Sequence, residues 1–238
     1  MSLDDLPQAL KHLKISYPGV VPANQLFSPP SIPLVGGKDF LSYRLNTISR
    51  QLQTLEVRAV LSDDFFDITD HATSWPLLQS LSIDFDPCTP CGDWMLELDP
   101  TDSDVELDHE RAYEFEVRTG GYKSEAEWPA RMDYPRRSFR TAVNTDILND
   151  ICLAAARAMA RMPNLRNLKL NVGDDTTESG CQCTFTSDGR SSHKVVWQSR
   201  SATMYEPHAD VIAAWKQVFV ERTGDLEIQV LGYEHTLI

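Results

Sequence analysis

The sequence lacks the features of a membrane or secreted protein. It has no hydrophobic run close to the ~20 residues that a membrane-spanning helix needs, and no Asn-x-Ser/Thr acceptor for glycosylation. Its first residues are acidic, where a signal peptide needs basic residues followed by an apolar block. Five cysteines are few and odd in number for 238 residues, which argues against a disulfide framework. We therefore expect a cytoplasmic or nuclear protein without a membrane partner.

Basic residues are also scarce. The chain has 22 Lys and Arg against 35 Asp and Glu, which gives a formal net charge of -13. A surface of this sign repels the phosphate backbone of nucleic acids, so we expect no nucleic-acid partner. It favours instead a protein partner with a basic surface. Nothing in the composition indicates an oligomeric state.

Recognisable catalytic and cofactor motifs are missing as well. The chain contains no H-E-x-x-H, G-x-S-x-G, phosphate-binding loop or dinucleotide fingerprint. We therefore expect no catalytic residues and no cofactor. An alternative stays open, because catalytic residues need not be close in sequence: a small enzyme could have an unrecognised site in the loops at the strand ends.

What the chain does contain is a hydrophobic pattern, L-x-x-L-x-[LIV], in four places. Each copy is typical of a short buried strand, whose alternate side chains point to opposite faces. If the leucines face a core, the residues between them form an open polar face and are candidates for partner binding. The four boxes are Leu10–Ile15, Leu52–Val57, Leu78–Ile83 and Leu165–Leu170, and the candidates are Lys14, Glu56, Arg58, Asp84, Lys169 and Asn171.

Helices are expected between the boxes. A 3.6-residue period of apolar residues predicts helices over about 39–49, with Phe40, Leu41, Leu45 and Ile48 on one face, over 145–161, and after Pro207. Asp-Gly between apolar runs predicts a hairpin of Gln182–Thr186 and Lys194–Gln198, and Leu226–Val230 follows as a fifth strand. Strands that alternate with helices favour a parallel sheet. We therefore expect an α/β fold: an irregular, leucine-rich-repeat-like curved parallel sheet with helices on one face and an inserted β-hairpin.

The repeat is irregular. First leucines fall at positions 10, 52, 78 and 165, and only the step from Leu52 to Leu78 matches the roughly 20–29-residue period of leucine-rich repeats. The asparagine or cysteine that usually follows the strand is replaced by Pro18, Val60, Asp86 and Gly173. We expect a single degenerate domain over 1–238 with an acidic insertion at about 86–142.

Further local patterns accompany the boxes: Leu6–Pro7, Trp75–Ile83, Cys91–Trp94, Ser138–Thr141, Met162–Leu165, Val195–Trp197 and Trp215. With these patterns the chain resembles the leucine-rich-repeat-like region of fungal F-box proteins of uncharacterised function. The resemblance implies substrate recognition for a cullin-type ubiquitin ligase. The F-box that docks the ligase adaptor should precede this region, whereas the chain starts at its first box. We therefore expect a lost F-box, a fragment or shortened product, or a module that acts alone.

Two cysteine pairs leave a zinc-stabilised interaction domain open. Cys88 and Cys91 form a C-x-x-C motif, and Cys181 and Cys183 a C-x-C motif. Four thiolates could hold a tetrahedral zinc ion if the hairpin folded over the first pair. The alternative is that all four are ordinary reduced cysteines, so we assign no metal ligand.

Charged and aromatic residues outside the boxes offer weaker candidates. The acidic stretch from Asp93 to Glu116 is either a solvated insertion or a docking surface for a basic partner. A nearby arginine cluster either pairs with these acids or binds phosphate. Trp197 and Trp215 are expected in the core, whereas the other tryptophans lie in or near loops, where they could bind a partner. The cluster is Arg131, Arg136, Arg137 and Arg140, and the loop tryptophans are Trp75, Trp94 and Trp128.

Overall fold

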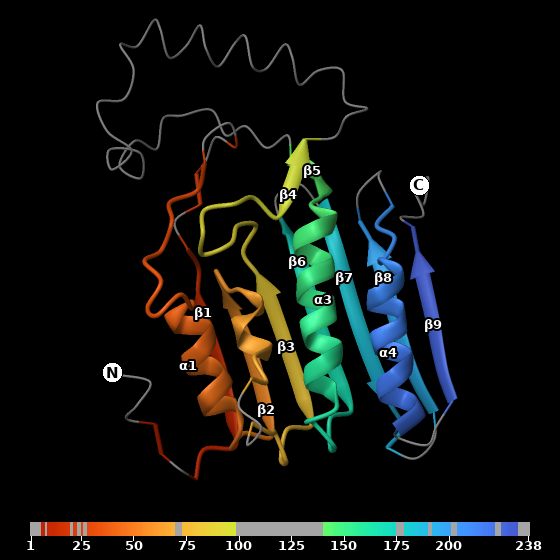
Figure 1. Cartoon of the computed structure of the whole chain (residues 1–238). Coiled ribbons are helices and arrows are strands. Elements are labelled where there is room, and N and C mark those ends of the chain that lie inside the picture. The colour runs from red at the N-terminus through yellow and green to blue at the C-terminus, as the bar shows by residue number, and fades with distance from the viewer. Residues whose placement is uncertain are drawn as a thin grey trace, which may run out of the picture.

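The computed structural model shows a mixed α/β fold with a seven-stranded sheet and helices packed on one of its faces (Figure 1). It describes residues 6–7, 9–19, 21–22, 25, 28–69, 73–98, 140–174, 179–189, 192–200, 204–221 and 225–232. Arg131, Arg136, Arg137, Trp128 and most of the acidic stretch lie outside these ranges.

The four boxes form four neighbouring parallel strands, as predicted. These are β1 (His12–Tyr17), β2 (Thr54–Ala59), β3 (Ser80–Phe85) and β6 (Asn167–Asp174). Their register is uninterrupted, so Leu13, Leu55, Leu81 and Leu168 lie in one row across the sheet. The last three are fully buried. The sheet order is β1-β2-β3-β6-β7-β8-β9, so neighbours in the sheet follow one another along the chain.

The hairpin forms as predicted, but it is part of the sheet and not an insertion into a parallel sheet. Its strands β7 (Ser179–Ser187) and β8 (Ser192–Ser199) are full members of the sheet. β7 pairs antiparallel with both β6 and β8, and the last strand, β9 (Asp225–Leu231), pairs parallel with β8. The sheet is therefore mixed, because a hairpin whose inner face is apolar buries that face by continuing the sheet. A second, two-stranded antiparallel sheet joins β4 (Leu96–Leu98) to β5 (Arg140–Val143).

Three helices and a short 3₁₀ segment cover the inner face. They are α1 (Phe40–Ser49), η2 (Asp63–Phe66), α3 (Thr145–Met159) and α4 (Ala209–Glu221). Asp39 and Asn144 cap the N-termini of α1 and α3 with side-chain oxygens that accept backbone N–H groups. No helix within the described ranges is both long and apolar enough to cross a membrane.

The inner face of α1 agrees with the prediction in part. Leu45 is buried and Leu41 and Ile48 pack against the core, whereas Phe40 is 55% exposed. Polar residues are buried beside them, namely Ser42, Asn46 and Ser49. Asn46 donates its side-chain N–H groups to two backbone carbonyls of the η2 segment, at 2.7 and 3.1 Å. Ser49 accepts the indole N–H of Trp75 at 2.7 Å. The helix is therefore attached to its neighbours by buried hydrogen bonds, which hydrophobic periodicity does not detect.

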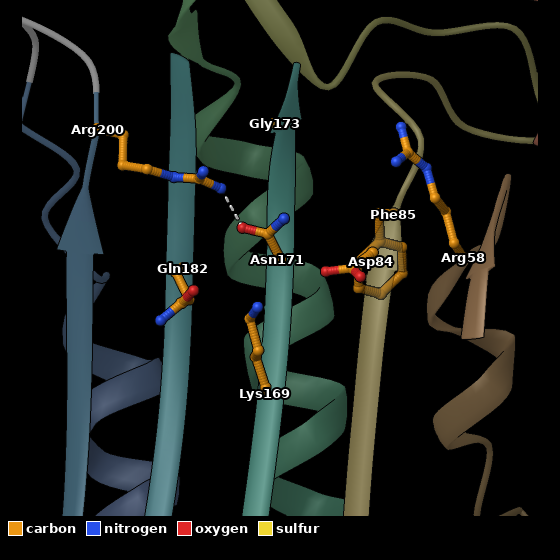
Figure 2. Close-up of a pocket in the computed structure, with 8 residues that line it drawn as sticks. All are labelled: Arg58, Asp84, Phe85, Lys169, Asn171, Gly173, Gln182 and Arg200. Atoms are coloured by element: carbon orange, nitrogen blue, oxygen red, sulfur yellow. Dashed lines mark hydrogen bonds between the residues drawn. The ribbon is translucent and has the colours of Figure 1, made fainter. Parts of the chain in front are cut away.

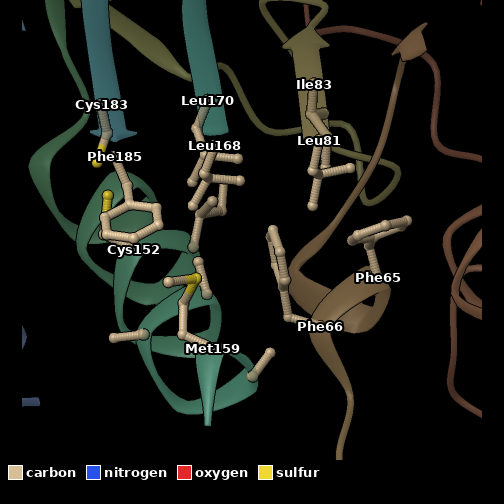
Figure 3. Packing of buried hydrophobic residues seen from close by; sticks show 14 of the residues in the cluster. Phe65, Phe66, Leu81, Ile83, Cys152, Met159, Leu168, Leu170, Cys183 and Phe185 are labelled. Atoms are coloured by element: carbon tan, nitrogen blue, oxygen red, sulfur yellow. The ribbon is translucent and has the colours of Figure 1, made fainter. Parts of the chain in front are cut away.

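The core is continuous from η2 to α4. Figure 3 shows Phe65 and Phe66 beside the leucine and isoleucine side chains of β3, with α3 packed on β6 and β7. Trp197 and Trp215 are fully buried in an edge-to-face pair, as expected for core residues. Trp75 is also fully buried and Trp94 is 7% exposed, so these two are not available to a partner as the loop prediction suggested.

Candidate functional site

The opposite face of the sheet is not covered by any described helix and carries polar side chains, as alternation predicted (Figure 1). The strand register places one row of these residues across six strands. In an ideal sheet, neighbours in such a row are about 4.8 Å apart, so their side chains can form one continuous polar surface. The row consists of Ser16, Arg58, Asp84, Asn171, Gln182 and Gln198.

A polar pocket of about 190 Å³ opens at the centre of this row. It lies toward the carboxyl ends of β2, β3 and β6, and Figure 2 shows its polar side chains in front of the strands, on the side away from the helices. We refer to it as the row pocket. Its lining residues are Arg58, Asp84, Phe85, Lys169, Asn171, Gly173, Gln182 and Arg200.

The structure brings together four of the six predicted binding residues, since Arg58, Asp84, Lys169 and Asn171 all line the row pocket. The other two lie outside it. Lys14 and Glu56 form a surface ion pair at 2.6 Å across β1 and β2. The hydrogen bond that Lys14 donates to the Glu56 carboxylate raises the pKa of Lys14, so this lysine stays charged.

Sequence reasoning missed Gln182 and Arg200. Gln182 could have been found, because it alternates with Cys181 and Cys183 in the predicted hairpin strand and those cysteines face the core. Arg200 follows β8 and reaches back across β7, where its Nη2 donates to the side-chain oxygen of Asn171 (Figure 2). No sequence pattern indicates this contact, because it depends on the antiparallel placement of β7.

Several polar atoms of the row pocket have no partner among the described residues. Asp84 Oδ1 and Arg200 Nε are both buried and form no hydrogen bond. The Lys169 ammonium forms neither a hydrogen bond nor an ion pair within the described part of the chain. Buried donors and acceptors that lack partners are costly, so the pocket is a candidate for a site that a bound water or ligand would complete.

A second group of contacts forms the border of the pocket on the β2 side. Asp86 is 4% exposed and lies 3.6 Å from Arg58 Nε. Its carboxylate also accepts the backbone N–H of Gly19 at 2.6 Å. A side chain at Gly19 would meet Val60 at 2.2 Å, so only glycine allows the chain after β1 to approach Asp86 this closely. The Arg58 charge is therefore already opposed by a buried acid.

The four candidate zinc ligands are not brought together. Cys181 and Cys183 point into the core, where the thiol of Cys183 lies beside that of Cys152 (Figure 3). Cys88 is buried in the turn after β3 and Cys91 is exposed. Burial raises the pKa of Cys88 to about 12, which disfavours the thiolate that zinc requires. Within the described ranges no three His, Cys, Asp or Glu side chains gather as a possible metal site.

Arg140, the member of the arginine cluster that the structure describes, forms contacts within the fold. Arg140 donates to the backbone oxygens of Gln25 and Leu96, at 2.9 and 3.3 Å. Its guanidinium lies 5.3 Å from the centre of the Trp94 ring. Arg140 thus joins the start of β5 to Gln25 and to the start of β4.

Comparison with known proteins adds a partial match. Residues 136–235 are similar to a family of unknown function, DUF6546. No curated protein and no solved structure matches the chain. The matched region includes Lys169, Asn171, Gln182 and Arg200, but neither Arg58 nor Asp84.

The row pocket is suited chemically to binding a polar group. Lys169 and Arg200 offer charged donors, and the amides of Asn171 and Gln182 offer both donors and acceptors. Asp84 adds an acceptor at the centre. The lining contains no hydroxyl, thiol or imidazole.

Proposed function

We propose that the protein is a non-enzymatic protein-interaction module that binds its partner over the open face of the seven-stranded sheet. The observation that carries this proposal is the row pocket on that uncovered face. Its lining includes donors and an acceptor that have no partner among the described residues. Repeat proteins present extended binding surfaces in this way, with the helices on the opposite side. At about 190 Å³, the pocket is below the roughly 300–1,000 Å³ of sites that enclose small molecules. It therefore suits one group of a larger partner.

We interpret the sheet as a degenerate leucine-rich-repeat array. The four boxes lie in one register and bury their leucines together, as stacked repeats do. Asp86 occupies a position where a regular repeat has asparagine, and it accepts a backbone N–H there. With the resemblance to F-box proteins, this interpretation extends the proposal to substrate recognition for a cullin-type ubiquitin ligase in the cytoplasm or nucleus. The partner is a protein, and a basic surface on it would complement the net charge of -13.

The test compares two charge-reversed forms of the chain in affinity purification from the native organism. The open-face variant carries Lys14→Glu, Glu56→Lys, Arg58→Glu and Lys169→Glu. The control carries Arg157→Glu and Lys216→Glu, two exposed positions on helices α3 and α4. Circular dichroism and thermal unfolding confirm that both fold.

We expect a partner that the wild type and the control enrich equally and that the open-face variant loses at least about tenfold, which corresponds to ~1.4 kcal/mol. The interaction is then repeated with the purified partner. Equal binding by all three forms would place the interface elsewhere and refute the assignment of the face.

An enzyme is the second candidate, because the row pocket lies toward the carboxyl ends of parallel strands, where α/β enzymes place their sites. Asp84 would then be the acid or base, as the carboxylate in the lining. A metabolite screen discriminates the two. Turnover by the wild type that disappears in Asp84→Asn would favour the enzyme.

A further inference from the structure

We infer that the row pocket binds the terminal carboxylate of a polypeptide chain, so that the partner is recognised through its C-terminal residue. This inference rests on the proposed function and names the part of the partner that enters the pocket. It follows from the charge, the hydrogen-bonding atoms and the size of the pocket.

The charge of the pocket matches a single negative charge. Arg58 is opposed by Asp86 at 3.6 Å, and Figure 2 shows its side chain on the far side of Asp84 from the other cations. This leaves Lys169 and Arg200 against one carboxylate, Asp84, a balance of one positive charge. A carboxylate completes that balance. A phosphate group carries about two negative charges at neutral pH, and one of them would face the Asp84 carboxylate.

The hydrogen-bonding atoms of the pocket favour a ligand that carries an N–H donor next to its negative charge. Arg200 Nε and the Lys169 ammonium can donate to a carboxylate. Asp84 Oδ1 has no donor among the described residues, so a ligand that also supplies an N–H would satisfy it. Asp84 pairs in register with Asn171, to which Arg200 is hydrogen-bonded. The acceptor for the ligand N–H and the donors for its carboxylate therefore lie about one strand spacing apart, ~4.8 Å. In a C-terminal residue the amide N–H and the carboxylate are attached to the same Cα atom. In an Asp or Glu side chain the carboxylate lies one or two carbons farther from the N–H.

The size and floor of the pocket agree with a chain end. Its volume of about 190 Å³ corresponds to about six water molecules at ~30 Å³ each, enough for one terminal residue. Its floor is the sheet itself, and Gly173 contributes no side chain there. A Cβ atom at Gly173 would lie 2.5 Å from the Ser179 carbonyl oxygen and 3.5 Å from Arg200 Nη2. The glycine thus keeps the space in which Arg200 meets Asn171.

The test uses small probes and the full chain, and measures chemical-shift changes of the side-chain amides of Asn171 and Gln182 by NMR. N-acetylglycine carries the carboxylate and the adjacent N–H. Acetate lacks the N–H, and N-acetylsarcosine carries a methyl group in its place. N-acetylglycinamide lacks the charge, the α-amide of N-acetylglutamate moves the carboxylate to a side chain, and the amide of N-acetyl-O-phosphoserine supplies a phosphate.

We expect saturable binding of N-acetylglycine and binding about tenfold weaker, or ~1.4 kcal/mol, for each of the other probes. Lys169→Gln and Arg200→Gln should each weaken the binding of N-acetylglycine by a similar factor. Lys194→Gln is the matched control, because this cation lies on the same face but is paired with Glu227 at 3.4 Å, and it should bind as the wild type does. Asp84→Ala, which removes the acceptor for the ligand N–H, should abolish the preference for N-acetylglycine over N-acetylsarcosine.

Stronger binding of the phosphoserine or glutamate probe would overturn the inference in favour of that group, and so would equal binding of N-acetylglycine and N-acetylsarcosine. Absence of any binding would also overturn it. The proposed function fails separately: the open-face variant would then retain the partner. If that variant loses the partner but N-acetylglycine does not bind, the inference of a bound chain end is wrong, while the proposal of an interaction module is retained.

Discussion

Asp86 offers the most direct test of how the open face is built. This buried carboxylate accepts the Gly19 N–H from the chain after β1 and lies 3.6 Å from Arg58 of β2. Its own backbone N–H donates to the carbonyl of Ala59 at 3.0 Å. One residue after β3 therefore joins the ends of three strands, at the border of the row pocket.

The expected cost of removing this side chain can be divided between its two contacts. A hydrogen bond to a charged group contributes about 1.5–3 kcal/mol. The ion pair contributes about 0.2–1 kcal/mol, because the Arg58 side chain is half exposed. We expect Asp86→Ala to lower the free energy of unfolding by ~2–3 kcal/mol, a fall in Tm of about 5–10 °C for a chain of this size. Asp86→Asn keeps an oxygen for Gly19 and should cost ~1 kcal/mol or less.

The assay is urea unfolding followed by circular dichroism, with the slope m checked for constancy. Asp150→Ala, at an exposed position of α3, is the control and should change the free energy of unfolding by less than about 0.5 kcal/mol. A double-mutant cycle with Arg58→Ala measures the ion pair separately. The reasoning is wrong if Asp86→Asn costs as much as Asp86→Ala, or if Asp86→Ala is no worse than the control.

Three further predictions test the packing. Leu81→Ala should lower the free energy of unfolding by about 2–5 kcal/mol, while its open-face neighbour Ser82→Ala should change it by less than about 0.5 kcal/mol; similar costs would mean the faces are assigned incorrectly. Asn46→Ala should cost ~2–3 kcal/mol, because two backbone carbonyls lose their donor, and a cost equal to that of exposed Thr47→Ala would refute this contact. Asp63 has a raised pKa from burial and an acidic neighbour, so the folded state binds its proton more readily and is stabilised as the pH falls through that pKa. Asp63→Asn should therefore raise Tm at pH 7 and lose this acid-dependent gain, and an unchanged dependence of Tm on pH would contradict the assignment.

The strands could be predicted because their signal is local. In each box a period of two separates the leucines from the polar residues, and the burial of Leu55, Leu81 and Leu168 follows that alternation. The same reasoning placed Arg58, Asp84, Lys169 and Asn171 on one face. Strand register then brought them to one pocket, and register is a property of pairing that no single box contains.

The remaining features depend on contacts between distant segments. The inner face of α1 buries polar residues beside its predicted leucines, because Asn46 and Ser49 have partners in η2 and at Trp75, and hydrophobic periodicity does not detect such contacts. The hairpin strands entered the sheet because β6 presented an edge to β7. Arg200 reaches the pocket only through that antiparallel pairing, so it could not be found from its neighbours in sequence.

The β4–β5 pair has a practical consequence for making a shorter protein. Leu98 and Arg140 are paired in register on adjacent antiparallel strands, so the two ends of the described chain on either side of residues 99–139 lie next to each other. A tight turn of the Asn-Gly type spans such a gap, so a chain in which it replaces residues 99–139 tests whether α3 and the row pocket form without them. The shortened chain would keep every residue named in the two proposals, and its smaller size would suit the NMR titrations.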